Sequence, residues 1–267
     1  MDGVIGLKRL REHYDNDNIV KSYEKLRFSD LAGIIEHDIS LGIINYFIKK
    51  EKPNLLLEIA TGPGRLTKHI KLWNKGVGID SSERMLKLSK KNVDNSNWKF
   101  LKSDINKMPF KENYFDMVIT FRLLIHFTNT QRNNSYKKIK KILKKGGLLI
   151  FDVGNEQYYK PSLINFLLKG YRLFKSEQKN KLLPQIYNNP ATKEQIINEL
   201  EKNNFDIVKV YGVNSYNSLV LLLLALSKRI KFLSKVIKSL ILFIEKNNQS
   251  NINKYGTFIV IAKNEKA

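Results

Sequence analysis

The chain has 267 residues, of which 42% are hydrophobic, and a formal net charge of +22. This length suits one large α/β domain with additions, and the absence of cysteine excludes disulfides, thiolate metal sites and cysteine nucleophiles. The positive field favours polyanionic partners such as RNA or anionic lipid. However, the basic residues are mostly lysine, which is also typical of a whole-chain compositional bias. No long apolar segment begins the sequence, so we expect a cytoplasmic protein.

The N-terminal segment, residues 1–53, carries helical rather than strand signals. Apolar side chains from Ile39 to Ile48 fall on one helical face, and Pro53 is a stop signal. Upstream, Tyr23 and Arg27 lie on neighbouring helical turns, either in a surface helix or in a lid over a pocket. We predict that this segment is a helical cap.

An apolar run that ends in a small-residue loop is the most informative stretch of the sequence. Residues 55–59 do not alternate in polarity, as expected of a strand buried on both faces of a parallel sheet. Ala60, Gly62 and Gly64 follow, and their small side chains let a ligand lie against the backbone. Glu58, inside the run, needs a hydrogen-bonding partner, which is either a ligand or the start of the next helix.

Strands and helices alternate along the rest of the chain. Strands are predicted at 54–60, 76–80, 98–103, 115–120, 147–152, 205–211 and 257–263. Helices are predicted at 65–73, 82–92, 132–144 and 192–203, the last of which begins with a capping-box pattern. This alternation predicts a doubly wound parallel sheet, whose ligands bind at the carboxyl ends of the strands.

Polar residues follow the predicted strands at those ends. Asp80 ends the second strand at a distance from the glycine loop that suits a ribose diol, and Asp104 follows the third. Thr120 and Arg122 follow the fourth strand. Each aspartate alone is also typical of a helix N-cap. Together with Glu58, acids at three adjacent strand ends indicate a ligand site more strongly than any one of them.

Six motifs occur in an order and spacing that resemble a known family. They are Leu-Glu-Ile-Ala-Thr-Gly-Pro-Gly-Arg at 57–65, Gly-Ile-Asp-Ser-Ser-Glu-Arg-Met-Leu at 78–86, Ser-Asp-Ile at 103–105 with Met-Pro-Phe at 108–110, Phe-Asp-Met-Val-Ile-Thr at 115–120, Leu-Ile-His-Phe at 124–127 and Leu-Lys-Lys-Gly-Gly at 143–147. Over residues 54–152 the chain resembles a class I S-adenosylmethionine-dependent methyltransferase, of the branch that includes the ubiquinone and menaquinone methylases. The resemblance implies a Rossmann-like seven-stranded sheet of order 3-2-1-4-5-7-6, with the last strand antiparallel and helical insertions around it.

The resemblance also implies S-adenosylmethionine as cofactor, S-adenosylhomocysteine as its product, and a role for each matching residue. The methionine moiety would be held by Glu58, by the loop with Ala60, Gly62 and Gly64, and by Thr120. Asp80 would bind the ribose, and the adenine would lie against Asp104, Ser81, Met85 and Ile105. Ala60 stands where the family usually has its first glycine, and Pro63 stiffens the loop, but neither blocks the approach of a ligand to the backbone.

Methyl transfer from a sulfonium is an in-line displacement, in which the protein mainly positions the acceptor and excludes water. No catalytic triad is therefore expected. His126 is the candidate general base for a hydroxyl acceptor, because an ordinary histidine pKa of about 6.5 suits that task; alternatively it anchors its loop. Arg122 would bind an anionic acceptor or the cofactor carboxylate, and Tyr23 and Arg27 would bind that carboxylate from the lid. The remaining histidines show no metal-like spacing, so we predict no metal.

Two insertions divide the predicted single domain of 1–267. A cofactor-binding core at 54–157 continues at 188–213 and 255–263, and the insertions are 158–187 and 214–254. In the second insertion, apolar residues recur at helical spacing from Leu226 to Ile244, and four lysines lie on another face, Lys228, Lys231, Lys235 and Lys238. This basic amphipathic helix either roofs the acceptor pocket, which we prefer, or contacts an anionic membrane through 219–246.

The predicted function is methyl transfer to a small lipophilic acceptor that resembles a quinone, a prenyl compound or a lipid, at oxygen or carbon. An RNA methyltransferase, recruited by the positive field, is the first alternative, although no added RNA-binding module is evident and nucleic acid is the less favoured partner. A non-enzymatic cofactor-binding or membrane-associated module is the second. The predicted location is cytoplasmic, with or without peripheral attachment to a membrane.

Overall fold

The computed structural model describes residues 11–16, 20, 30–72, 74–94, 96–159, 189–215, 218–247, 249 and 255–265. Almost all of the predicted insertion 158–187, and the predicted lid residues Tyr23 and Arg27, lie outside the described residues.

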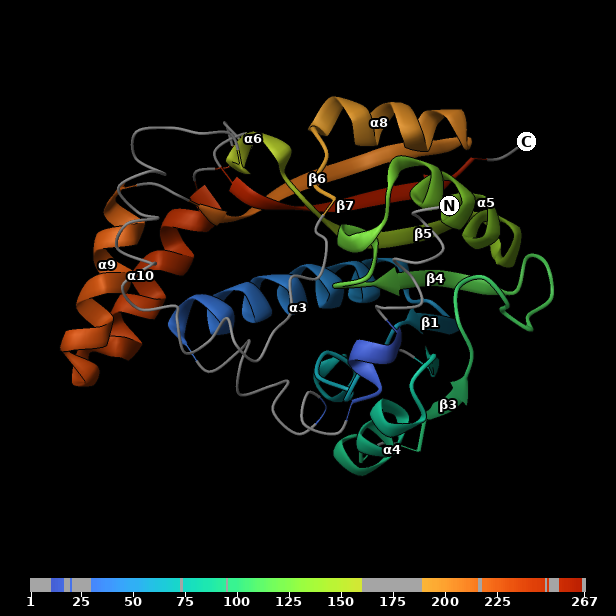
Figure 1. Ribbon diagram of the computed structural model, residues 1–267, viewed down its shortest axis with the longest axis horizontal. Helices are drawn as coiled ribbons and strands as arrows, with labels where there is room; N and C mark the ends of the chain where they lie inside the picture. Colours follow the sequence, from blue (N-terminus) through green and yellow to red (C-terminus); the bar gives the residue numbers. More distant parts are fainter. Residues whose placement is uncertain are drawn as a thin grey trace.

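Seven strands form one mixed sheet (Figure 1). They are β1 (Leu55–Ile59), β2 (Lys75–Asp80), β3 (Trp98–Lys102), β4 (Phe115–Thr120), β5 (Leu143–Gly154), β6 (Phe205–Ser215) and β7 (Tyr255–Asn264). Their order is β3-β2-β1-β4-β5-β7-β6, and β7 runs antiparallel to both of its neighbours. The predicted fold class and strand order are therefore confirmed. β6, which begins between the two predicted insertions, and β7, which follows the second, belong to the same sheet as β1 to β5.

Helices cover both faces of this sheet (Figure 1). They are α3 (Leu31–Glu51), α4 (Glu83–Asn92), α5 (Asn129–Ile142), α6 (Glu156–Tyr159), α8 (Lys193–Lys202), α9 (Ser218–Arg229) and α10 (Ser234–Asn247). Short 3-10 segments are η1 (Thr67–His69), η2 (Leu124–His126) and η3 (Lys231–Leu233). The capping box predicted at Thr192 is present, since its hydroxyl accepts from the Gln195 amide and the Gln195 side chain accepts from the Thr192 amide.

Each face of the sheet buries its own apolar core. Tyr136 of α5 and Leu200 of α8 pack with the side chains of one face, and Ile44 and Phe47 of α3 pack with those of the other. By length and composition alone α3 could cross a membrane. One side of α3, with Ile44, Phe47 and Ile48, instead packs on the sheet, and the predicted cap at 1–53 as a whole stays a prediction.

The α-helix predicted at 65–73 is wrong. The chain forms turns from residue 62 to residue 66 and then the single 3-10 turn η1. Gly62 and Gly64 adopt left-handed backbone angles on either side of Pro63, which delays the start of regular helical geometry. Two helical hydrogen bonds form, from Lys68 to Gly64 and from Ile70 to Leu66, but they do not continue into a helix.

The helix predicted from Leu226 to Ile244 is two helices. The apolar run that precedes it is itself helical and belongs to α9, and the chain turns at residues 230–233 before α10 begins. Val220 and Ile237 both reach Ile35 of α3 in one small core. A straight helix would bring only one of its ends to α3, so folding back into a hairpin buries more apolar surface. Figure 1 shows α9 and α10 side by side at one end of α3.

Candidate functional site

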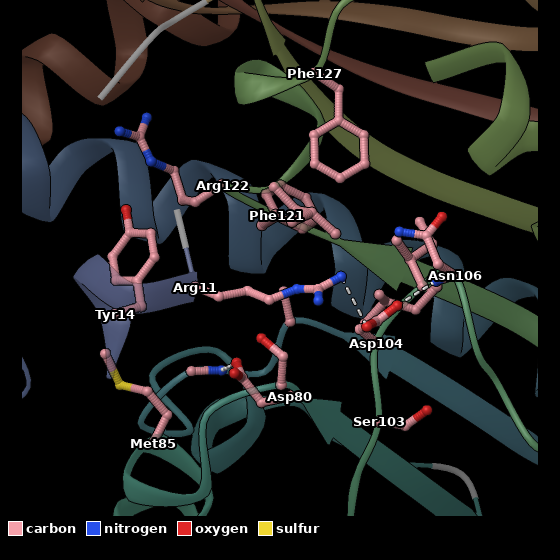
Figure 2. Close-up of a pocket in the computed structure, with 16 residues that line it drawn as sticks. Arg11, Tyr14, Asp80, Met85, Ser103, Asp104, Asn106, Phe121, Arg122 and Phe127 are labelled. Atoms are coloured by element: carbon pink, nitrogen blue, oxygen red, sulfur yellow. Dashed lines mark hydrogen bonds and ion pairs between the residues drawn. The ribbon is translucent and has the colours of Figure 1, made fainter. Parts of the chain in front are cut away.

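A cavity of about 780 Å³ opens at the carboxyl ends of β1, β2, β3 and β4 (Figure 2). Among the residues predicted to form the site, those that line it are Ala60, Gly62, Asp80, Ser81, Met85, Asp104, Ile105 and Arg122. Lining residues that the sequence did not single out are Arg11, Tyr14, Ile59, Ser103, Asn106, Phe121, Leu123 and Phe127. A concave site lined by apolar side chains and a few polar groups is typical of small-molecule and cofactor sites.

Asp80 is nearly buried at the end of β2 and is held by backbone amides. It accepts hydrogen bonds from Gly62 at 2.8 Å and from Ser82 at 2.9 Å. The N-cap of α4 is Ser82, whose hydroxyl accepts from the Met85 amide, so Asp80 is not the cap. Burial raises the pKa of the Asp80 carboxyl despite these amide donors. A ligand with hydroxyl donors would stabilise its ionised form.

Asp104 faces the same cavity from the end of β3. One of its oxygens accepts from the Asn106 amide at 2.6 Å, as in a local turn, and the other lies 3.0 Å from the Arg11 guanidinium. Figure 2 shows Arg11 extending from the N-terminal segment to Asp104. A second contact holds this segment, because the Ser82 hydroxyl donates to Asp15 at 2.9 Å. Residues 11–16 therefore lie at the mouth of the cavity.

The N-terminal contribution to the cavity comes from residues that sequence reasoning missed. The pattern that indicated a lid, an aromatic residue and an arginine on neighbouring positions of a helix, occurs at Tyr23 and Arg27 and again at Arg11 and Tyr14. Pattern alone does not distinguish the two occurrences. The structure places Arg11 and Tyr14 at the cavity, while a role for Tyr23 and Arg27 stays a prediction.

Glu58 is buried next to the cavity but is not among the residues that line it. Its carboxylate accepts hydrogen bonds from the Thr67 hydroxyl at 2.5 Å and from the Thr61 hydroxyl at 3.1 Å. These two hydroxyls are the partners that its burial requires. Burial raises the pKa of Glu58 from 4.5 to about 7, against the effect of both hydroxyls. A contact between Glu58 and a ligand stays a prediction.

The raised pKa of Glu58 predicts the pH dependence of stability. Its folded-state pKa of about 7 lies above its ordinary 4.5, so between these pH values the folded protein binds more protons than the unfolded chain. The free energy of unfolding should therefore fall as pH rises through this range. Glu58→Gln should reduce this fall, measured by urea unfolding at several pH values. Burial raises the pKa of Asp80 and Asp152 too, with the same sign, so part of the slope should remain. An unchanged slope in the variant would contradict the prediction.

The loop after β1 carries three residues with left-handed backbone angles, Ala60, Gly62 and Gly64. Gly62 lines the cavity, and a Cβ atom added to it would meet no other atom within 4 Å. A Cβ atom on Gly64 would lie 2.8 Å from the Val93 side chain and 3.3 Å from the Ser89 backbone. Gly64 is therefore required by packing against α4, while the space beside Gly62 is available to a ligand.

Alanine at these two glycines should have different effects. Each substitution imposes a left-handed backbone on a residue with a Cβ atom, which costs about 1–2 kcal/mol. Gly64→Ala adds an overpacking cost of about 1–3 kcal/mol and should mainly lower stability in urea unfolding. Gly62→Ala should mainly weaken S-adenosylhomocysteine binding in calorimetry, because its methyl group enters the cavity. Equal cofactor affinities in the two variants would argue against a ligand beside Gly62.

Arg122 lines the cavity from the segment that follows β4, with a left-handed backbone angle φ of 63°. Its amide donates to buried Asp152 at 2.7 Å, and its guanidinium lies 3.6 Å from Glu36 of α3. Burial raises the pKa of Asp152 to about 6, although Arg122 lowers it. This network fixes a cation at the rim of the cavity, where it can bind an anionic group.

Three other predicted site residues lie outside the cavity lining. Gly64 packs on α4, and Thr120 is fully buried in β4 with a hydroxyl that makes no hydrogen bond within the described part of the chain. His126 is largely buried in η2, and its carbonyl accepts from the Asn189 side chain at 2.8 Å. This contact is made by the backbone, so it does not test the alternative that the histidine side chain anchors the loop. The roles of Thr120 toward the methionine moiety and of His126 as a base stay predictions.

The cavity fits S-adenosylmethionine by the chemistry of its lining. Asp80 would offer carboxylate oxygens to the ribose hydroxyls, and Asp104 would offer them to the adenine amine. Met85 and Ile105 would supply apolar surface for the adenine ring, and the bare backbone at Gly62 would admit the chain that links it to sulfur. When bound, this cofactor supplies an electrophilic methyl group. The residues of the chain bind it, orient it and exclude water around it.

Comparison with known proteins agrees with this geometry. Residues 56–147 match a family described as a methyltransferase domain. An uncharacterized protein of Methanocaldococcus jannaschii is 26% identical over 221 residues, which are 78% of this chain and 81% of that protein. The ubiquinone/menaquinone biosynthesis C-methyltransferase of Wigglesworthia glossinidia brevipalpis is 31% identical over 57% of this chain and 62% of its own length.

Among solved structures, magnesium protoporphyrin IX methyltransferase from Synechocystis, with bound S-adenosylhomocysteine, superposes with a TM-score of 0.64 at 13% identity, over 97% of this chain and 99% of that one. At this identity the likeness shows the fold, while the matched sequence family covers the strands whose ends carry Asp80 and Asp104. The domain match and the shared fold together support a class I S-adenosylmethionine-dependent methyltransferase.

Proposed function

We propose that the enzyme methylates a small lipophilic acceptor that carries a polar or anionic group, at oxygen or carbon. The observation that carries this proposal is the apolar wall formed by Phe121, Leu123 and Phe127, which all line the cavity. Figure 2 shows Phe121 and Phe127 on the far side of the cavity from Asp80. A quinone, a prenyl compound or a lipid would bury its apolar surface on these side chains.

Arg122 supplies the polar contact in this proposal. It lies beside Phe121 and Leu123 and is fixed by Asp152 and Glu36. An acceptor whose acid or hydroxyl group binds Arg122 while its apolar part lies on the wall would be held in one orientation. Positioning of this kind can supply roughly 7–11 kcal/mol of the barrier in a two-reactant step.

The relatives are compatible with such an acceptor. The Wigglesworthia relative is a C-methyltransferase of ubiquinone and menaquinone biosynthesis, and the Synechocystis structural relative methylates magnesium protoporphyrin IX. Both names denote mostly apolar ring compounds with polar substituents. The net charge of +22 instead favours RNA as acceptor, so the test must separate the two.

The test uses S-adenosylmethionine with a radiolabelled methyl group, cell extract and the purified enzyme. We expect label in the organic-solvent fraction, and much less there with Asp80→Asn at a cofactor concentration that does not saturate the variant. Label in the RNA fraction alone would overturn the proposal.

Once an acceptor is isolated, Arg122→Gln should raise its KM and leave the affinity for S-adenosylhomocysteine unchanged. A parallel loss of that affinity would place Arg122 on the cofactor carboxylate instead. Leu101→Ser, at an exposed apolar position of β3, is the matched control and should change neither quantity.

A further inference from the structure

The helices α9 and α10 each carry two apolar stripes, of which one is buried and one is exposed. In α9, Val220 and Leu223 are buried in the small core with α3, while three leucines spaced three and four residues apart face solvent. These leucines are Leu219, Leu222 and Leu226. A surface helix of a soluble protein normally has polar residues on its outer face.

The second helix repeats this arrangement. Ile237 and Ile241 of α10 are buried in the same core, while Leu233, Val236, Leu240 and Phe243 form an exposed stripe at helical spacing. Phe232, in the turn between the helices, is 85% exposed, and Phe243 is 66% exposed. Two phenylalanines and several aliphatic side chains on one hairpin exceed the scattered apolar residues of an ordinary surface, and such patches mark interaction sites.

The charge of the hairpin indicates what binds there. Residues 218–247 contain six basic residues, Lys228, Arg229, Lys231, Lys235, Lys238 and Lys246, and one acid, Glu245, which is buried. Arg229, Lys235 and Lys246 are exposed around the apolar stripes. A second copy of the chain would bring the same positive charge to the contact and repel it, whereas an anionic surface would be attracted.

We propose that the hairpin α9–α10 binds the surface of an anionic phospholipid membrane. Phe232, Leu233 and Phe243 enter the boundary between headgroups and acyl chains, and Arg229, Lys235 and Lys246 bind lipid phosphates. An apolar face with aromatic residues, bordered by basic residues, is the pattern of helices that lie in the membrane interface.

The hairpin is fixed to the rest of the enzyme, so docking would orient the whole domain. Lys238 of α10 lies 2.5 Å from Asp38 of α3. Two residues earlier on α3, Glu36 pairs with Arg122 at the rim of the cavity. The contact between the hairpin and α3 therefore lies two residues from the ion pair at the cavity rim, although no described residue of the hairpin lines the cavity itself.

The experiment measures sedimentation of the full chain with vesicles of phosphatidylcholine alone and of phosphatidylcholine mixed with phosphatidylglycerol. We expect binding to the anionic vesicles that weakens with added salt. The double variant F232S/F243S should bind roughly tenfold more weakly or worse, because two large apolar side chains no longer enter the interface. R229Q/K235Q/K246Q should bind more weakly and lose most of the salt dependence.

The matched control is Tyr46→Ser with Leu101→Ser, which removes two exposed apolar side chains from other surfaces and should leave vesicle binding unchanged. Calorimetry with S-adenosylhomocysteine should give the same affinity in all variants, which shows that they fold, and this result does not depend on the acceptor. Failure of the wild type to sediment with anionic vesicles, or equal binding by F232S/F243S, would overturn the proposal. So would a dimer in light scattering that F232S/F243S converts to monomer.

Discussion

Asp80→Asn should weaken S-adenosylhomocysteine binding by about tenfold to one hundredfold. A hydrogen bond to a charged group contributes about 1.5–3 kcal/mol, and about 1.4 kcal/mol corresponds to a factor of ten in affinity. The two Asp80 oxygens already accept from Gly62 and Ser82 at 2.8 and 2.9 Å. The neutral amide keeps one acceptor oxygen, and its NH₂ group would face donors. Isothermal titration calorimetry measures the change.

The control for this variant is Asp116→Asn. Asp116 is also an aspartate that accepts from a backbone amide, that of Leu55 at 2.8 Å, and it pairs with Lys144 at 2.7 Å. It lies at the start of β4, at the opposite end of the strands from the cavity. Asp116→Asn should lower stability without changing cofactor affinity. If both variants bound S-adenosylhomocysteine as the wild type does, the assignment of Asp80 would be wrong.

Glu199→Gln should lower the free energy of unfolding by about 3–5 kcal/mol, the range for breaking a buried ion pair. Arg132 and Glu199 are both buried, and two of their hydrogen bonds are 2.6 and 2.9 Å long. The same guanidinium donates to the carbonyls of Phe127 at 2.8 Å and Asn189 at 3.2 Å. The pair therefore also anchors the segment that carries the apolar wall. Urea unfolding measures the loss.

Glu112→Gln is the matched control, because Glu112 pairs with Lys141 at 3.2 Å on the surface, where both side chains are exposed. Breaking an exposed pair costs about 0–1 kcal/mol. If both variants lost a similar free energy of unfolding, burial would not be the reason that the Arg132–Glu199 pair stabilises the protein.

Sequence patterns predicted the features that depend on local order. The apolar run without alternation predicted the position of β1, because a strand buried on both faces has no polar side. The acids Asp80 and Asp104 follow strands directly, so their meeting in the cavity follows from the parallel arrangement.

Features that depend on distant partners were not predicted. Arg132 and Glu199 are 67 residues apart, and neither helix shows which cation meets which acid. The turn between α9 and α10 has no proline or glycine to mark it in the sequence. It depends instead on the packing of both helices on α3, which is distant in the sequence. Arg11 was not predicted because the same pattern, an aromatic residue and an arginine near each other on a helix, also occurs at Tyr23 and Arg27.

The N-terminal segment at the cavity mouth has a consequence for turnover. The contacts that hold it in place include the ion pair between Arg11 and Asp104 and two hydrogen bonds to Asp15, from the Ser82 hydroxyl and the Arg84 guanidinium, and Arg11 is half-exposed. Contacts of this kind are weak and are screened by salt. We therefore expect spent product to be exchanged for fresh cofactor when these contacts open, without unfolding of the sheet. Exchange should become faster as ionic strength rises.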